Sequence, residues 1–197
     1  MNTIEQAQQL KTIADMLERT RYNIRSNSIF YLIWGWLVLL SVLIEYILLT
    51  QFNSPYHFMV WIISMPLAGV SSSLAGRKHR LKQKHTTLMD TVMKFLWIGI
   101  TMGIFFSLAF SNVIGWTHSY VLIILFYGIG TFVSGGVLKF KPLTIGGILS
   151  IVLSFVIAFI PDLHKSFENV LLLLALSVTM SYLIPGYMLR SKVSLDV

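Results

Sequence analysis

The chain has no cysteine, and charged residues are scarce. The absence of thiols excludes disulfide bonds, thiol catalysis and thiolate metal sites. Only 12% of the 197 residues are charged, whereas an average soluble domain carries about 25%. Hydrophobic residues make up 55% of the chain. A single soluble domain of this length could not bury so much apolar surface, so we expect lipid to surround most of it.

The sequence also lacks the motifs of common enzymes. It contains no His-Glu-x-x-His, no Gly-x-Ser-x-Gly and no phosphate-binding glycine loop. No apolar segment carries two carboxylates. We therefore expect no enzymatic activity and no cofactor. The formal net charge of +7 would suggest nucleic acid in a soluble protein, but basic loops beside a membrane explain it here. We expect no nucleic-acid partner.

Six long apolar segments follow the polar residues 1–27. A bilayer core about 30 Å thick is crossed by about 20 helical residues, which is close to the length of each segment. Backbone groups in lipid must be paired within the protein, and a helix pairs them within one segment. The sequence therefore predicts an all-α membrane protein. The predicted spans are 28–50, 57–74, 92–110, 120–138, 143–160 and 170–189.

A dense cluster of positive charge separates the second and third apolar segments, within residues 76–85. Its basic residues are Arg77, Lys78, Arg80, Lys82 and Lys84. Short loops rich in Lys and Arg stay on the cytoplasmic side of a membrane, so we predict a cytoplasmic loop here. The three outer turns then hold a single basic residue, Lys165. This asymmetry predicts three consecutive hairpins with both termini in the cytoplasm.

Residues 1–27 carry an amphipathic pattern that predicts a short cytoplasmic helix. One interpretation is that this helix lies on the lipid headgroups. The other is that residues 4–24 dock a protein partner. The predicted organisation is thus an N-terminal helix over 1–27, a transmembrane domain over 28–189 and a cytoplasmic tail over 190–197. The apolar positions at helical spacing are Ile4, Ala7, Leu10, Ile13, Ala14 and Leu17.

Prolines and glycines interrupt several predicted helices. In transporters, broken helices expose backbone groups to a solute. A proline kink packed by neighbouring helices explains the same pattern. The residues that could break a helix or line a cavity are Pro66, Gly69, Gly128, Gly130, Pro185 and Gly186.

Small residues recur one helical turn apart in the later segments. Lipid gives helices little hydrophobic reason to associate, so close approach of small residues must contribute. We expect this pattern to serve packing within the molecule. It occurs at Gly99 and Gly103, at Gly130 and Ser134, and at Gly146, Ser150 and Ser154.

Each predicted outer turn carries one histidine. His57, His118 and His164 could form a zinc site with Glu45 if they converged. The alternative is that each is an ordinary side chain at the membrane interface. A rise of about 1.5 Å per residue places Glu45 about 25 Å beyond Ser28, near the outer interface. Charged groups that mark a proton relay lie near the middle of the membrane. We therefore do not expect Glu45 to belong to such a relay.

Two stretches of the chain carry a resemblance. They are Glu18-Arg19-Thr20-Arg21 leading into Phe30-Tyr31-Leu32-Ile33-Trp34-Gly35-Trp36, and Leu183-Ile184-Pro185-Gly186-Tyr187. Together they look like a group of uncharacterised small bacterial membrane proteins. The resemblance implies six helices and a bacterial inner membrane, and it carries no activity.

These patterns favour a non-enzymatic membrane protein that acts through partners, as an accessory or regulatory subunit. The scarcity of charge within the spans, the amphipathic residues 4–24 and the basic cluster are the reasons. The alternative is a transporter or channel for a small solute. Pro66 and the glycines of the fourth and fifth segments favour that alternative.

Overall fold

The computed structural model describes residues 28–80 and 88–195, and within these ranges the chain is all-helical with no strand. The predicted N-terminal amphipathic helix and the predicted docking segment at 4–24 lie outside the described residues. Lys82 and Lys84 lie outside them too. Six helices are long and apolar enough to cross a membrane. The predicted all-α membrane architecture is confirmed at this level.

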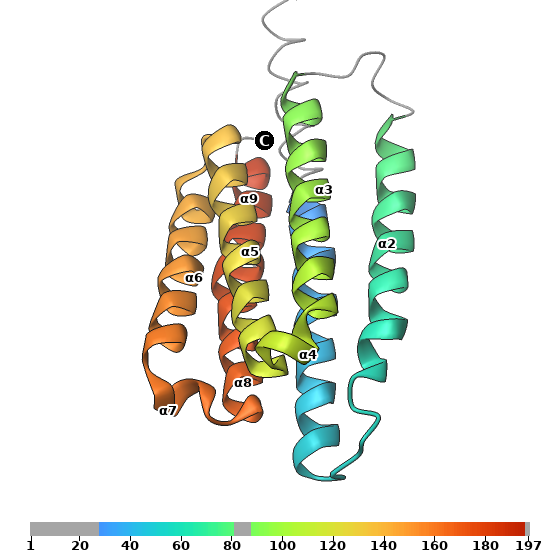
Figure 1. The fold of residues 1–197 in the computed structure, drawn as a ribbon. Coiled ribbons are helices and arrows are strands. Elements are labelled where there is room, and N and C mark those ends of the chain that lie inside the picture. Colours follow the sequence, from blue (N-terminus) through green and yellow to red (C-terminus); the bar gives the residue numbers. More distant parts are fainter. Residues whose placement is uncertain (1–27, 81–87, 196–197) are drawn as a thin grey trace, which may run out of the picture.

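The first of the six spans is the Ser28–Thr50 helix. The next four are α2 (Met59–Arg80), α3 (Leu88–Ala109), α5 (Trp116–Val137) and α6 (Lys141–Phe159). The sixth is one continuous rod made of α8 (Phe167–Val178), the π-helical segment η1 (Thr179–Leu183) and α9 (Ile184–Leu195). Two short helices, α4 (Ser111–Ile114) and α7 (Pro161–His164), join spans. Figure 1 shows these two helices and the 51–58 segment at one end of the bundle.

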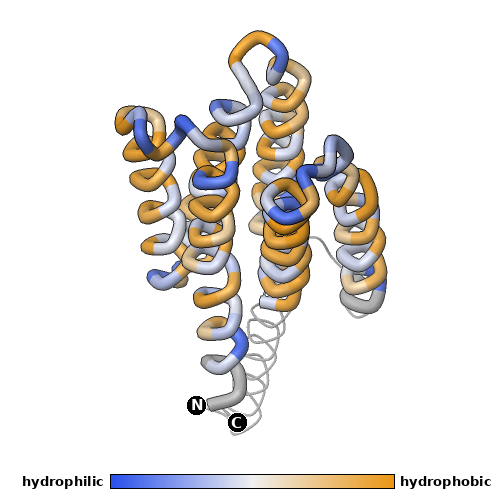
Figure 2. The backbone as a smooth tube through the Cα atoms, turned by 90° about the horizontal axis from the view of Figure 1, so that it is seen from below, coloured by the Kyte–Doolittle hydropathy of each residue, from blue (hydrophilic) through white to orange (hydrophobic). Residues whose placement is uncertain are grey.

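Hydrophilic residues gather in the connecting segments, and apolar residues fill the helices (Figure 2). Two predicted boundaries nevertheless differ from the structure. The basic stretch predicted as a loop is helical from Gly76 to Arg80, because α2 continues through it. Lys and Arg are good helix formers, so nothing in these residues ends the helix. The predicted tail is likewise helical as far as Leu195.

The predicted helix breakers in α2 and α5 do not interrupt their helices. Pro66 lies inside α2 with helix on both sides, and its side chain is exposed. Gly69 is also exposed, and no atom lies within 4 Å of where its Cβ would be. Gly128 and Gly130 are buried within α5. They permit close packing: a Cβ would lie 2.9 Å from the Ile151 backbone nitrogen at Gly128 and 3.2 Å from Trp97 at Gly130.

Pro185 lies just after η1, where the sixth rod changes from α-helical to π-helical geometry. The N–H of Ile184 bonds to the carbonyl of Thr179, five residues back. A proline has no N–H to give to the carbonyl four residues before it. A widened π turn at this place allows the rod to continue past Pro185, because it changes the hydrogen-bond register just before the missing donor. Gly186 then packs against Leu32 of the first helix.

The closest packing in the described bundle joins α5 and α6. A Cβ added at Gly147 would lie 2.3 Å from the backbone nitrogen of Phe132, and one at Gly135 would lie 2.4 Å from that of Thr144. Gly146 of α6 lies against the sixth rod: a Cβ added there would lie 2.6 Å from the Met180 carbonyl oxygen. Small residues thus let these backbones touch, as expected for helices that associate in lipid.

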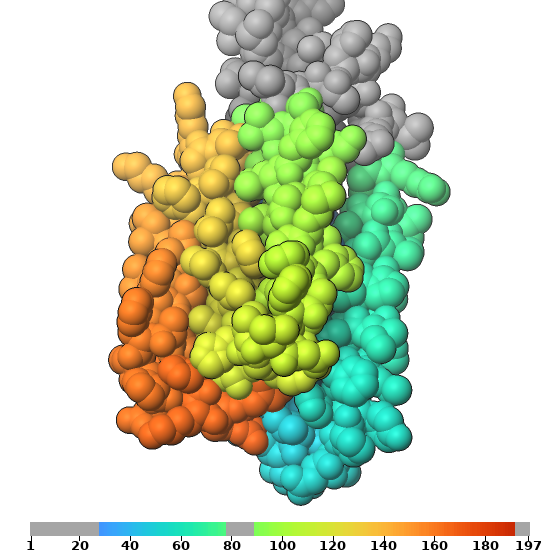
Figure 3. Space-filling model, in the orientation of Figure 1, coloured from blue at the N-terminus to red at the C-terminus, as the bar shows by residue number. Residues whose placement is uncertain are grey.

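Helix α2 lies along one side of the molecule (Figure 3). Close backbone packing links α5 with α3, α6 and α8, but α2 has no comparable packing with any element from α3 to α9. Only 11% of its spanning residues are buried, compared with 56% for α5 and 61% for the sixth rod. Helix α3 is also 11% buried. The core therefore sits around α5, and α2 is a peripheral helix.

Candidate functional site

The side chain of Glu45 is completely buried inside the bundle, with an exposed fraction of 0%. It belongs to the last two turns of the Ser28–Thr50 helix. Burying a carboxylate without partners is costly, and inside a membrane span such groups are paired and functional as a rule. Its surroundings are therefore the first place to look for a site.

Three side chains from three other segments bind this carboxylate. Trp61 Nε1 donates a hydrogen bond of 2.7 Å to Oε2. The Tyr120 hydroxyl lies 3.2 Å from Oε1 and 3.1 Å from Oε2, so its single hydrogen is shared between them. His57 Nδ1 lies 3.0 Å from Oε1 and donates to it when that nitrogen carries the hydrogen. We call Glu45, His57, Trp61 and Tyr120 the carboxylate cluster.

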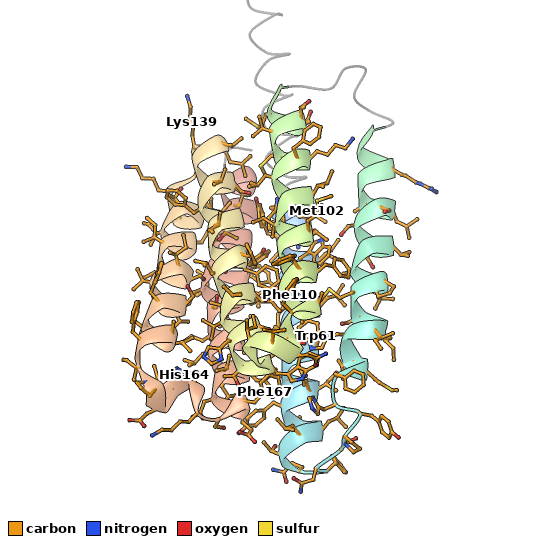
Figure 4. The ribbon with its side chains drawn as sticks, viewed as in Figure 1. Trp61, Met102, Phe110, Lys139, His164 and Phe167 are labelled. Carbon is orange, nitrogen blue, oxygen red and sulfur yellow. The ribbon has the colours of Figure 1, made fainter. Side chains whose placement is uncertain are left out.

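The local structure explains how these residues meet. The 51–58 segment turns the chain back and carries His57, and Trp61 lies in the first turn of α2. Tyr120 lies in the second turn of α5. Phe167, at the start of α8, packs against the Tyr120 ring at 4.9 Å and the His57 ring at 5.9 Å between centroids. Figure 4 shows Trp61 and Phe167 towards the same end of the bundle as His164, far from Lys139.

The carboxylate cluster can hold one negative charge inside a membrane span. Hydrogen bonds to an ionised acceptor are about twice as strong as neutral ones. The His57 side chain is 23% exposed, and its Nδ1 lies 3.0 Å from Oε1 of the carboxylate. The same bonds join the first helix to α2 and to α5. The cluster is thus both an ionisable site and a clamp.

The predicted metal constellation is not assembled. Glu45 and His57 form one pair, and His118 and His164 form another, with ring centroids 5.2 Å apart. His164 Nδ1 lies 2.8 Å from the carbonyl oxygen of Ile157. Among the residues that the structure describes, no group of three or more His, Asp or Glu could hold a metal ion. His57 lies with Glu45, away from the His118–His164 pair, so the three imidazoles do not converge on one point.

Trp61 and Tyr120 are functional candidates that the sequence reasoning missed. A usable signal was present, because each stands near the start of a predicted span, at the same expected depth as Glu45. An aromatic side chain with an O–H or N–H needs a partner when it is buried. Pairing these donors with Glu45, the one acidic side chain inside a predicted span, would have predicted the cluster.

A second buried group of side chains lies on the other half of α5. The rings of Tyr31, Trp97 and Tyr127 surround Tyr182 of η1, with centroids 5.9, 6.0 and 5.5 Å from it. We call these four residues the aromatic cluster. It joins the first helix, α3, α5 and the π-helical segment.

Several polar atoms at the aromatic cluster have no partner among the described residues. They are the hydroxyls of Tyr31 and Tyr182, the indole Nε1 of Trp97 and Ser134 Oγ. The Tyr31 hydroxyl and Ser134 Oγ are close enough to interact with each other, whereas the Tyr182 hydroxyl and Trp97 Nε1 have no such neighbour in the described chain. Buried polar groups normally find a protein partner or a bound molecule, so these atoms mark a second place where a polar ligand could be held.

Comparisons of this chain with protein-family models, with curated proteins and with solved structures found no match. The resemblance to small bacterial membrane proteins stays a prediction. The function proposed for this protein accordingly rests on its own residues and their geometry.

Proposed function

We propose that this chain is a multi-pass membrane protein without enzymatic activity, an accessory or regulatory subunit that acts through a protein partner. The observation that carries this proposal is the position of α2. The carboxylate cluster holds α2 to the bundle near its first turn through Trp61, while only 11% of its spanning residues are buried. A partner helix would find most of the surface of α2 accessible.

The composition of α2 supports contact with another transmembrane helix. Gly69 and Gly76 are seven residues apart and therefore share a face. Neither would bring a Cβ within 4 Å of another atom. Helices associate in membranes through such small residues and through hydroxyl groups.

Site-directed cross-linking tests the partner proposal, because the chain contains no cysteine. A Gly69→Cys variant would be labelled with a benzophenone maleimide in the membranes of the native host and irradiated. Val152 on α6, which is 52% exposed, gives the matched Val152→Cys control. We expect one adduct of defined mass from position 69 that is absent from position 152. Identical adducts from both positions, or none from position 69, would refute the proposal.

The aromatic cluster favours a second candidate, a transporter or channel for a small solute. A solute with hydrogen-bonding groups would satisfy the unpartnered Tyr182 hydroxyl and Trp97 Nε1. Thermal-shift screening of the purified protein against small polar solutes tests this idea. A genuine ligand should lose its stabilising effect in Tyr182→Phe and keep it in Tyr187→Phe, because Tyr187 is an exposed residue bonded to Trp36.

We further propose that both termini are cytoplasmic, that the six spans form three consecutive hairpins and that the membrane is a bacterial inner membrane. The distribution of basic residues supports this orientation. Lys139, Lys141 and Arg190 belong to helix ends opposite to the end that carries Lys165 (Figures 1 and 4). Lys and Arg are enriched in cytoplasmic segments. The resemblance stated above supports the inner membrane.

A further inference from the structure

Helix α2 carries a cavity near the end that is remote from the carboxylate cluster. Its volume is about 370 Å³, and its lining includes Ser72, Ser73, Gly76 and Arg77. These residues follow Trp61 by 11 to 16 positions, which is about 17 to 24 Å along a helix. Cavities from about 300 Å³ upward are typical of small-molecule sites. This cavity therefore lies near the opposite membrane face and can hold a group of moderate size.

The residues that line the cavity suit an oxyanion. Arg77 offers a planar fork of N–H donors that fits phosphate oxygens in pairs. Ser72 and Ser73 add hydroxyl donors, and Ser72 Oγ is buried without a partner among the described residues. No atom of the described chain lies within 4 Å of the Cβ position of Gly76, so a ligand can approach the backbone there. None of the lining residues that the structure describes is a carboxylate, a group that would repel an anion.

The surroundings suit a lipid better than a free ion. Val70 and Leu74, on the same stretch of α2, are 57% and 59% exposed and present apolar side chains where acyl chains would run. Lys78 and Arg80 follow in the last turn of the same helix. Basic sites on the cytoplasmic side of transmembrane helices bind anionic headgroups. A phosphate held by Arg77 would thus remain attached to a lipid that lies along α2.

We propose that the cavity formed by Ser72, Ser73, Gly76 and Arg77 binds the phosphate of an anionic phospholipid headgroup. The occupant is recognised by its phosphate oxygens through Arg77 and the serine hydroxyls, and by its chains through the apolar side of α2. The cavity shares Gly76 with the face proposed for the protein partner, so lipid and partner would compete there, and the purified protein without a partner tests the lipid alone.

Native mass spectrometry of the purified full chain tests the proposal. The protein would be reconstituted into nanodiscs that contain phosphatidylglycerol and phosphatidylcholine, and the retained lipid would be counted after release. We expect wild type to retain phosphatidylglycerol, and Arg77→Gln to retain about tenfold less, a factor that corresponds to about 1.4 kcal/mol. Ser72→Ala should weaken retention in the same direction. Arg190→Gln, which removes an exposed arginine of α9, is the matched control and should behave as wild type.

Two outcomes would overturn the proposal. Equal retention by wild type and Arg77→Gln would show that the cavity does not select the lipid. An equal loss in Arg77→Gln and Arg190→Gln would show a general effect of charge. A separate arm adds inorganic phosphate to lipid-free protein in detergent. Arg77-dependent binding of that ion, without retention of phosphatidylglycerol, would overturn the lipid assignment in favour of a free phosphate compound. Melting temperatures of all variants control for folding.

Discussion

Trp61 Nε1 and Glu45 Oε2 are 2.7 Å apart, the shortest contact in the carboxylate cluster. This hydrogen bond joins the first turn of α2 to the last part of the first helix. Although α2 has no close backbone packing with α3 through α9, its Ser64 and Ala68 side chains are buried, so this bond is one of several contacts that hold α2. Glu45 thus ties the first helix to the start of the peripheral helix that carries both the proposed partner face and the proposed lipid site.

We predict that Glu45→Ala destabilises the protein by about 2 to 4 kcal/mol. The change leaves three donors without an acceptor, and side-chain hydrogen bonds between membrane helices contribute about 0.6 to 1.7 kcal/mol each. Unfolding with SDS in mixed micelles measures the difference. Asp162→Ala is the control, because that carboxylate is 81% exposed beside Lys165 and surface pairs contribute little. Equal stability of the two variants would contradict a clamping role for Glu45.

We predict opposite effects for two glycine substitutions. Gly147→Ala should cost about 1 to 3 kcal/mol, because its Cβ would meet the Phe132 backbone at 2.3 Å and push α5 from α6. Gly99→Ala should be neutral or slightly stabilising, since no atom lies within 4 Å of that Cβ position and alanine is the better helix former. Thermal melting in detergent separates the two. A melting temperature of Gly147→Ala equal to that of wild type would show that α5 and α6 are not in backbone contact.

We predict energetic coupling between Ser150 of α6 and Ser177 of α8. Ser177 Oγ donates a 2.8 Å hydrogen bond to Ser150 Oγ, and both side chains are buried. The single variants Ser150→Ala and Ser177→Ala and the double variant form a mutant cycle. The expected coupling energy is about 0.6 kcal/mol and at most about 1.7 kcal/mol, as measured for other membrane helices. If the stability changes of the two single variants add up to that of the double variant, the two hydroxyls do not interact.

We predict that Pro66→Ala leaves stability unchanged or raises it by up to about 3 kcal/mol, the usual cost of proline inside a helix. Alanine restores the N–H that the carbonyl of Ile62 lacks, and the exposed Pro66 side chain makes few contacts that could be lost. SDS unfolding measures the change. A clear loss of stability would mean that the proline shapes α2 for packing or for a cavity.

We predict that Lys139 and Lys165 lie on opposite sides of the membrane, with Lys165 outside. Both side chains are exposed, so cysteine replacements at these positions can be labelled without disturbing the core. An impermeant maleimide should label Lys165→Cys in intact cells and Lys139→Cys only after lysis. The reverse pattern would show that the orientation is opposite to the one proposed. Labelling of both positions from outside would contradict the proposed hairpin arrangement.

The interior of this bundle could not be read from the sequence for a physical reason. A helix in water shows its buried face as an apolar stripe, because the other face must be polar. Here lipid and protein core are both apolar, so Ile44 and Val42 look alike in the sequence although Ile44 is 48% exposed and Val42 is buried at 0%. The rotation of each helix about its axis, and with it the set of contacts, therefore leaves no periodic signal.

The sequence by itself determined the six spans, because crossing a bilayer depends on the length and apolar character of each segment taken alone. Only the tertiary structure decided the burial of Glu45, whose partners lie 12, 16 and 75 residues away. It also decided which glycines bring backbones together and that Ser72, Ser73, Gly76 and Arg77 line a cavity. These features depend on how separate helices are rotated and paired, and that arrangement is a property of their mutual packing.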